Sequence, residues 1–154
     1  MGVYYFDTSA LVKRYAQELG TAWVMSITNP TAGHDIYVSR ITGPEMIAAL
    51  FRKVRTGEIA QVDALRAAEN FKVDFRSQYQ VVELTAEIAD RAMALAERHG
   101  LRGYDAVQLA AALELHTVRK RMKLPPLIFV SADDDLNRAG QVEGLMIENP
   151  NAYP

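Results

Sequence analysis

Short apolar runs recur along the chain at intervals that suit buried strands. Each run has three to five residues, is rich in β-branched or aromatic side chains, and is bounded by polar or turn-forming residues. The runs that predict strands are Val3–Phe6, Asp35–Ser39, Val81–Leu84, Leu127–Val130 and Leu145–Ile147.

Between these runs, apolar residues repeat with the period of amphipathic helices. Thr8 or Ser9 is expected to cap the first helix, which should continue to about Glu18. A polar tail is expected at Asn149–Pro154. The other predicted helices cover Thr21–Thr28, Thr42–Thr56, Ile59–Arg76, Thr85–His99, Gly103–Arg121 and Asp134–Ala139. In the predicted helix Ile59–Arg76, which follows Gly57, the residues expected to face inward are Ile59, Val62, Leu65 and Ala68.

Strands that alternate with helices predict an α/β fold. The central sheet should be mostly parallel, with about four to five strands, and helices should cover both of its faces. No repeat, linker or shift in composition divides the sequence, so residues 1–154 are expected to form one domain. In folds of this class, functional sites lie outside the carboxyl ends of the strands.

Composition narrows the class of protein further. With 49% hydrophobic and 23% charged residues, the chain is not a disordered one. It has no cysteine, which excludes disulfides and thiolate zinc sites and permits a reducing, cytoplasmic location. Neither a secretory signal nor a membrane-spanning stretch is expected. Since the net charge is −2, any contact with nucleic acid must come from a local basic patch or a bound metal.

Four acidic residues stand where the predicted fold would gather them. Asp7 and Asp133 follow the first and fourth predicted strands, so a parallel sheet places both at one edge. Glu45 and Asp105 lie in the first turns of helices that follow loops at that edge. Crowded carboxylates repel one another unless a cation joins them, and an all-oxygen set suits Mg²⁺ or Mn²⁺.

Each acid also has a purely structural interpretation. Glu45 completes a capping box with Thr42, and Asp105 in a first turn complements the helix dipole. Asp7 can bond to the amides of its own turn. The residues alone leave these alternatives open.

Four segments resemble the motifs of PIN-domain ribonucleases, and especially the VapC-like toxins of toxin–antitoxin pairs. They occur in the order typical of that family and extend over nearly the whole chain. The segments are Tyr4-Tyr5-Phe6-Asp7-Thr8-Ser9-Ala10-Leu11-Val12-Lys13, Ser39-Arg40-Ile41-Thr42-Gly43-Pro44-Glu45, Leu101-Arg102-Gly103-Tyr104-Asp105-Ala106-Val107-Gln108-Leu109-Ala110 and Phe129-Val130-Ser131-Ala132-Asp133.

The resemblance implies a three-layer α/β/α sandwich and a metal-dependent endoribonuclease with Mg²⁺ or Mn²⁺ as cofactor. The catalytic and metal-binding acids that it implies are Asp7, Glu45, Asp105 and Asp133. Asp135 is expected to share the metal or to replace Asp133. Ser9 is expected to hold a carboxylate or a metal-bound water, or else to cap its helix. The implied partners are RNA, a small antitoxin protein and a second copy of the chain.

Basic and apolar residues near the motifs predict contacts. The four cations expected to rim the acidic pocket and bind RNA phosphates are Lys13, Arg14, Arg40 and Arg102. Trp23 and its apolar neighbours are expected either to pack in the core or to form an interface with a partner.

Three other functions are weighed against the toxin. A phosphatase of the haloacid-dehalogenase type also places an Asp after its first strand, but it needs a second Asp where Ser9 stands and a later Lys that Ser131–Arg138 does not supply. A housekeeping RNA-processing PIN nuclease and a catalytically silent PIN-like binding module remain as alternatives.

Overall fold

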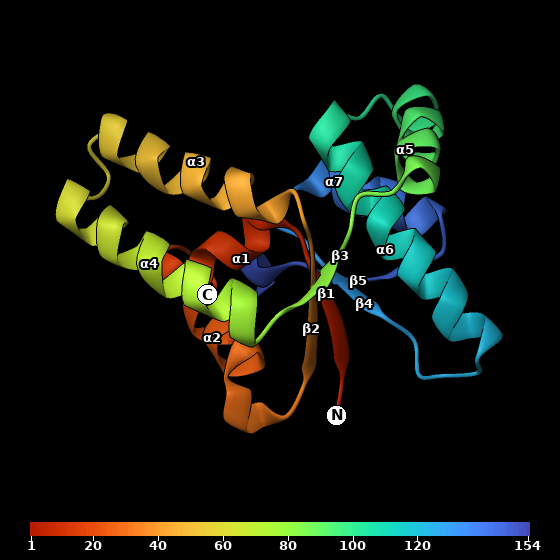
Figure 1. The fold of residues 1–154 in the computed structure, drawn as a ribbon, viewed down its shortest axis with the longest axis horizontal. Coiled ribbons are helices and arrows are strands. Elements are labelled where there is room, and N and C mark those ends of the chain that lie inside the picture. Colours follow the sequence, from red (N-terminus) through yellow and green to blue (C-terminus); the bar gives the residue numbers. More distant parts are fainter.

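A five-stranded parallel sheet forms the centre of the molecule (Figure 1). The computed structural model describes residues 1–154, and the sheet has the strand order β3-β2-β1-β4-β5. The strands are β1 (Val3–Phe6), β2 (Asp35–Ser39), β3 (Gln80–Val82), β4 (Ile128–Val130) and β5 (Met146–Glu148). All four pairings are parallel, so the predicted α/β fold is confirmed.

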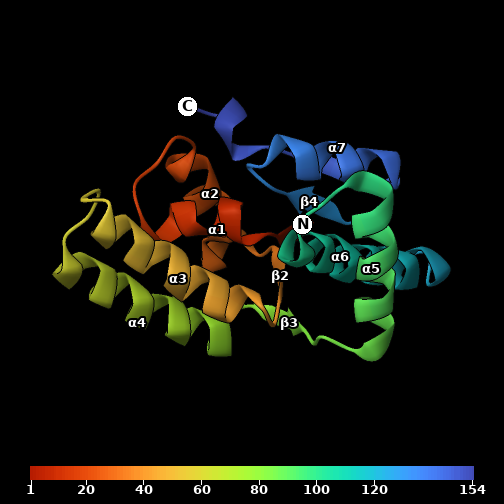
Figure 2. The same ribbon diagram turned by 90° about the horizontal axis from the view of Figure 1, so that it is seen from above.

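Helices cover the two faces of the sheet in separate groups, as the two perpendicular views show (Figure 2). One group is α1 (Thr8–Tyr15), α2 (Thr21–Thr28), α3 (Thr42–Arg55) and α4 (Gln61–Ser77). The other is α5 (Ala86–His99), α6 (Gly103–Arg121) and α7 (Asp134–Val142). Two short 3₁₀ turns complete the chain, Pro30–Ala32 and Pro150–Ala152. No helix is both long enough and apolar enough to cross a membrane.

The alternation of side chains along β1 builds a core on each face. Tyr5 belongs to the core under α5, α6 and α7, whereas Phe6 belongs to the core under α1, α3 and α4; both are fully buried. Successive strand residues point to opposite faces, so a short central strand supplies both hydrophobic layers. The three-layer α/β/α sandwich follows from this pattern.

The first helix begins and ends differently from the prediction. Its N-cap is Asp7, whose side chain accepts a hydrogen bond from the Ala10 amide, rather than Thr8 or Ser9. It ends at Tyr15, because Ala16 adopts an extended backbone, and it therefore stops short of Glu18. Asp is as good an N-cap as Ser or Thr, so Asp7 can take this role, and the helix begins directly after β1.

Of the residues predicted to face inward in this segment, Ala68 is confirmed as buried, Ile59 lies before the start of α4, and Val62 and Leu65 were predicted wrongly. Val62 and Leu65 are 60% and 51% exposed. The buried residues are Ala64, Ala67, Ala68 and Phe71. Three alanines let α4 approach its neighbours closely, and the Phe71 ring fills the core beside them. Alanines on a buried face add little to the hydrophobic periodicity of a sequence. The larger Val62 and Leu65 therefore determine the predicted inward face although they are exposed.

The C-terminal tail packs against the molecule. Pro150 is buried, and the Tyr153 ring stacks on the Trp23 ring with centroids 4.7 Å apart and an interplanar angle of 3°. Trp23 is therefore partly covered by its own chain. Met25, on the same helix, remains 52% exposed.

Candidate active site

All four acids singled out from the sequence line one pocket of about 540 Å³. Asp7 follows β1 and caps α1, whereas Asp133 lies three residues beyond β4 and caps α7. Glu45 and Asp105 come from the first turns of α3 and α6. Four separate elements thus bring carboxylates together at the carboxyl edge of the sheet, where a parallel α/β fold places its sites.

Asp7 is the most buried of these acids, with 3% of its surface exposed. Burial raises the pKa of Asp7 from 3.8 to about 7, although hydrogen bonds from Ser9, the Ala10 amide and Ser131 act in the opposite direction. The negative charge of Asp105 raises it further. Asp7 is therefore a carboxyl group whose ionised form is disfavoured when nothing compensates its charge.

Ser9 holds Asp7 in place. Its hydroxyl donates to Asp7 Oδ1 at 2.8 Å and accepts from the Ala132 amide at 3.0 Å. It also lies 3.4 Å from the Ser131 hydroxyl. Of the expected roles, Ser9 takes that of a group holding a carboxylate, and it links α1 to the loop after β4.

Glu45 is fixed by side chains from two other helices. Its Oε1 atom accepts from Thr8 Oγ1 at 2.9 Å and from Gln108 Nε2 at 2.8 Å. The expected capping box does not form, because the N-cap of α3 is Ile41 and Thr42 is the first helical residue. Thr42 instead accepts from Gln108 at 3.0 Å. Glu45 is thereby left to face the pocket.

Gln108 was missed by the sequence reasoning. It is 1% exposed on α6 and accepts a hydrogen bond from the Tyr5 hydroxyl at 2.8 Å. A buried amide between Tyr5 of β1 and Glu45 of α3 ties the sheet to the pocket. The available signal was a lone polar residue inside the apolar run that follows Asp105.

Asp105 and Asp133 occupy the other side of the pocket. Partial burial raises the pKa of Asp105, and the charges of Asp133 and Glu45 raise it further, whereas Arg102 lowers it. Asp133 Oδ1 accepts from the amides of Asp135 and Leu136 at 2.9 and 3.1 Å.

The run of three aspartates that follows β4 is divided among different contacts. The Asp135 side chain is exposed, pairs with Arg138 and does not line the pocket. Asp134 is also exposed and accepts from Asn149 at 3.2 Å. The pocket position therefore belongs to Asp133, the residue that the fourth motif selects.

The chemistry of the donors fits a hard divalent cation. They are carboxylate and hydroxyl oxygens with no thiol, which are the ligands of Mg²⁺ and Mn²⁺. Glu45 and Asp133 each use one carboxylate oxygen for hydrogen bonds and keep the other free. In the arrangement described, no three acidic or histidine side chains converge closely enough to hold an ion. Binding would therefore require side-chain rotation.

Only one of the four predicted phosphate-binding cations lines the pocket, namely Arg102. Lys13 is buried against Glu18 at 3.0 Å, and Arg14 pairs with Asp74 and donates to the Tyr79 hydroxyl at 2.7 Å. The expectation that these two rim the pocket is wrong, because Glu18 in the loop after α1 binds Lys13 and Asp74 of α4 binds Arg14.

Arg40 is also placed outside the pocket. Its guanidinium pairs with Glu83 and lies over the Phe75 ring, 5.4 Å from the centroid. Arg52, in the last turn of α3, also lines the pocket and was not among the four predicted cations. The pocket therefore combines four acids with two arginines.

The chain is similar to known proteins over most of its length. The family profile described as PIN domain matches residues 4–142. Ribonuclease VapC45 of Mycobacterium tuberculosis is 37% identical over 114 residues, which cover 73% of this chain and 76% of that protein.

Two solved structures, each below 25% identity, share the fold. The alignment with PAE2754 from Pyrobaculum aerophilum covers 95% of this chain and 89% of that protein, with a TM-score of 0.60 and 23% identity. VapBC2 from Rickettsia felis, bound to a DNA fragment from its promoter, covers 96% and 98%, with a TM-score of 0.61 and 14% identity. The pocket, the matched profile and the similarity of sequence agree, and the chain belongs to the PIN domain family.

Proposed function

We propose that this protein is a metal-dependent endoribonuclease and the toxin of a toxin–antitoxin pair. The observation that carries the proposal is the single pocket that Asp7, Glu45, Asp105 and Asp133 line from four separate elements. Burial and mutual repulsion hold the pKa values of Asp7 and Asp105 above their ordinary range, which is the electrostatic situation that a bound cation relieves. The 37% identity to a VapC ribonuclease supports RNA as the substrate.

The four acids would hold Mg²⁺ or Mn²⁺. When bound, such an ion polarises a phosphoryl oxygen and lowers the pKa of a coordinated water. The contribution of the chain itself is positional. Ser9 fixes Asp7, while Thr8 and Gln108 fix Glu45.

Binding of the polyanion falls to the arginines of the pocket. Arg102 and Arg52 both line it, and a guanidinium binds a phosphate through two parallel hydrogen bonds. We assign these two residues to RNA phosphates, in place of Lys13, Arg14 and Arg40. In this proposal the four acids of the pocket serve the cleavage chemistry, and its two arginines bind the substrate.

The proposed partners are a small antitoxin and a second copy of the chain. An arginine of the antitoxin would pair with the carboxylates and displace the cation. The crystallised VapBC2 of Rickettsia felis and a toxin–antitoxin complex from Klebsiella pneumoniae share this fold, which supports an antitoxin partner. The proposed location is the cytoplasm, where the RNA substrate is found.

Expression of the chain in a bacterial host tests the proposal. The wild type should arrest growth and leave cleaved RNA, and Asp7→Asn should do neither. Asp63→Asn, which changes an exposed acid of α4, is the matched control and should remain toxic. Co-expression of a small partner gene from the neighbouring reading frame should restore growth. RNA cleavage without growth arrest would favour the housekeeping nuclease, and the absence of both would favour a silent binding module.

A further inference from the structure

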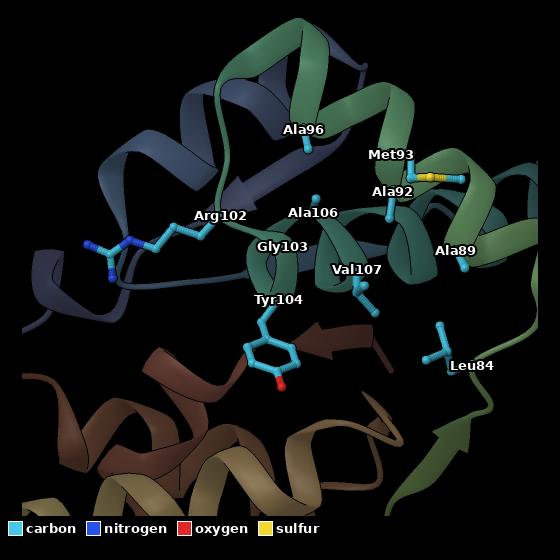
Figure 3. A pocket seen from close by; sticks show the side chains of 10 residues that line it. All are labelled: Leu84, Ala89, Ala92, Met93, Ala96, Arg102, Gly103, Tyr104, Ala106 and Val107. Atoms are coloured by element: carbon cyan, nitrogen blue, oxygen red, sulfur yellow. The ribbon is translucent and has the colours of Figure 1, made fainter.

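An apolar groove of about 440 Å³ lies beside the carboxylate pocket (Figure 3). Small side chains of α5 form one wall, and the first turns of α6 form the other. Arg102 and Tyr104 line both the groove and the carboxylate pocket. The two hollows therefore lie side by side and share these two residues.

Tyr104 stands at the junction of the two hollows. Its side chain projects from α6 toward the opposite helical layer (Figure 3), and Tyr104 lines both the groove and the carboxylate pocket. The residue is 66% exposed and precedes Asp105 directly. Its hydroxyl makes no hydrogen bond, and no other aromatic ring packs on it in the structure. An aromatic face is thus left open next to a carboxylate of the site.

The rest of the groove is apolar and partly open. Met93 and Leu84 are 65% and 47% exposed on its walls, whereas Ala92 and Ala106 are buried between them. Its volume is within the range of sites that bind small molecules, about 300–1,000 Å³. Exposed apolar side chains that line a concave surface beside a charged site are typical of a binding surface.

We propose that this groove binds one nucleobase of the RNA substrate, and that Tyr104 stacks on it. This inference rests on the proposed function, since it names how that same site holds its substrate. Proteins that bind single-stranded RNA combine a basic path for phosphates with aromatic side chains on which bases stack. Here Arg102 supplies the cation and Tyr104 the ring, two residues apart at the start of α6.

The composition of the groove also sets its selectivity. Apart from Arg102 and the Tyr104 hydroxyl, its lining consists of apolar residues and glycine, so few groups can read the hydrogen-bonding edge of a base. Stacking without edge contacts is tolerant of sequence and follows the size of the base. The groove should favour a purine over a pyrimidine only modestly and should not select one base.

Steady-state cleavage of a short single-stranded RNA tests the inference. Tyr104→Leu, which keeps an apolar side chain but loses the ring face, should raise KM by about tenfold, the loss expected for one stacked base, with a smaller change in kcat. Tyr104→Phe keeps the face and should have a KM at least about fivefold lower than that of Tyr104→Leu. Val142→Ala, an exposed change at the far end of α7, is the control and should behave as the wild type.

A modified substrate gives a second arm that needs no variant. Once the cleavage position is mapped, RNAs with an abasic nucleotide on either side of it are compared with the intact RNA. One of the two should raise the KM of the wild type about tenfold and should abolish the difference between the wild type and Tyr104→Leu. A structural role of Tyr104 would lower cleavage of every substrate alike and would not produce this loss of difference.

The outcomes separate the inference from the function on which it rests. If the wild type cleaves no RNA, the proposed function fails. If the wild type cleaves, but Tyr104→Leu and both abasic RNAs leave KM within twofold, the nucleobase site is refuted while the nuclease stands. If Tyr104→Leu or Met93→Gln converts a dimer to a monomer in analytical ultracentrifugation, the groove is an interface between two copies, and the nucleobase assignment is overturned.

Discussion

The replacement Asp7→Asn should stabilise the metal-free protein at neutral and alkaline pH. Asp7 is buried, and its carboxylate forms no ion pair with Arg52 or Arg102, the two arginines of the pocket. Asparagine has nearly the same shape and is an equally good N-cap, so it can still accept the hydrogen bonds from Ser9 and the Ala10 amide. The substitution removes a buried charge and leaves the packing in place.

The size of the effect follows from the pKa of Asp7. Burial raises that pKa from 3.8 to about 7, so ionisation is less favourable in the folded than in the unfolded chain. The stability contributed by the protonated carboxyl is present below the unfolded pKa of 3.8. It is lost as the pH rises through 7, and the loss reaches about 4 kcal/mol above pH 7. Asparagine does not titrate, so Asp7→Asn avoids this loss.

Urea denaturation in EDTA between pH 5 and pH 8 measures the prediction. At pH 8 the variant should exceed the wild type by about 2–4 kcal/mol in free energy of unfolding, and at pH 5 by less than half of that. In a thermal melt at pH 8, the same gain should appear as a rise in Tm of about 5–15 °C. Asp63→Asn, at an exposed position on α4, should change the free energy of unfolding by no more than about 0.5 kcal/mol and the Tm by no more than about 2 °C.

A destabilised variant would refute this reasoning. If Asp7→Asn unfolds more easily than the wild type at pH 8 in EDTA, the ionised Asp7 stabilises the fold as a helix cap, and its role is structural rather than functional. The same conclusion follows if the difference between the two proteins does not grow with pH. The Asp63→Asn control separates either result from a general effect of net charge.

Three further predictions concern other residues in and around the site. Gln108→Leu leaves the buried Tyr5 hydroxyl without its acceptor and removes one of the two hydrogen bonds to Glu45 Oε1, so it should lower the free energy of unfolding by about 1–3 kcal/mol, measured in urea, and lower kcat for RNA cleavage as well. Asp133→Asn should reduce cleavage at least about 100-fold, whereas Asp135→Asn should retain at least half of the wild-type rate; equal losses would mean that the pocket assignment of Asp133 is wrong. Arg14→Met should cost about 1–3 kcal/mol in stability with no change in KM, and the reverse pattern would place Arg14 on the substrate path.

The edge of the sheet that carries the site could be predicted from the sequence, because two of the acids closely follow predicted strands along the chain. Val3–Phe6 ends at Asp7, and a short apolar run also precedes Asp133. Once the strands are parallel, both acids must lie at one edge, whatever the packing of the helices. The four motifs then select the same acids that the structure brings into one pocket.

Contacts between distant residues could not be predicted in this way. Arg14 is bound by Asp74 and Tyr79, which lie about 60 positions further along the chain, and nothing around Arg14 signals them. Gln108 is likewise 63 positions from Glu45. A basic residue next to a motif can contact phosphate only if no acidic residue elsewhere in the fold binds it first, and the sequence does not show that partner. The tertiary fold decides which cations stay free.

Helix faces built from small residues escape sequence patterns for a different reason. In α4 the buried residues Ala64 and Ala67 contribute less hydrophobicity than the exposed residues Val62 and Leu65, so the periodic signal points to the wrong side. The alternative of a capping box at Thr42 is wrong because the helix begins one residue earlier than that motif requires, so that Thr42 is the first helical residue and Ile41 is the N-cap. The error in α4 reflects close packing between elements.

The central claim is that the four carboxylates form a divalent-cation site that cleaves RNA. Its most direct test is cleavage of a defined single-stranded RNA by the purified chain, with Mg²⁺ or Mn²⁺ and with excess EDTA. Asp105→Asn is compared with Glu114→Gln, which changes an exposed acid on the same helix. The wild type and Glu114→Gln should cleave only with the metal, and Asp105→Asn should lose at least about 100-fold in rate. Cleavage by the wild type that persists in EDTA, or equal rates for Asp105→Asn and Glu114→Gln, would contradict the claim.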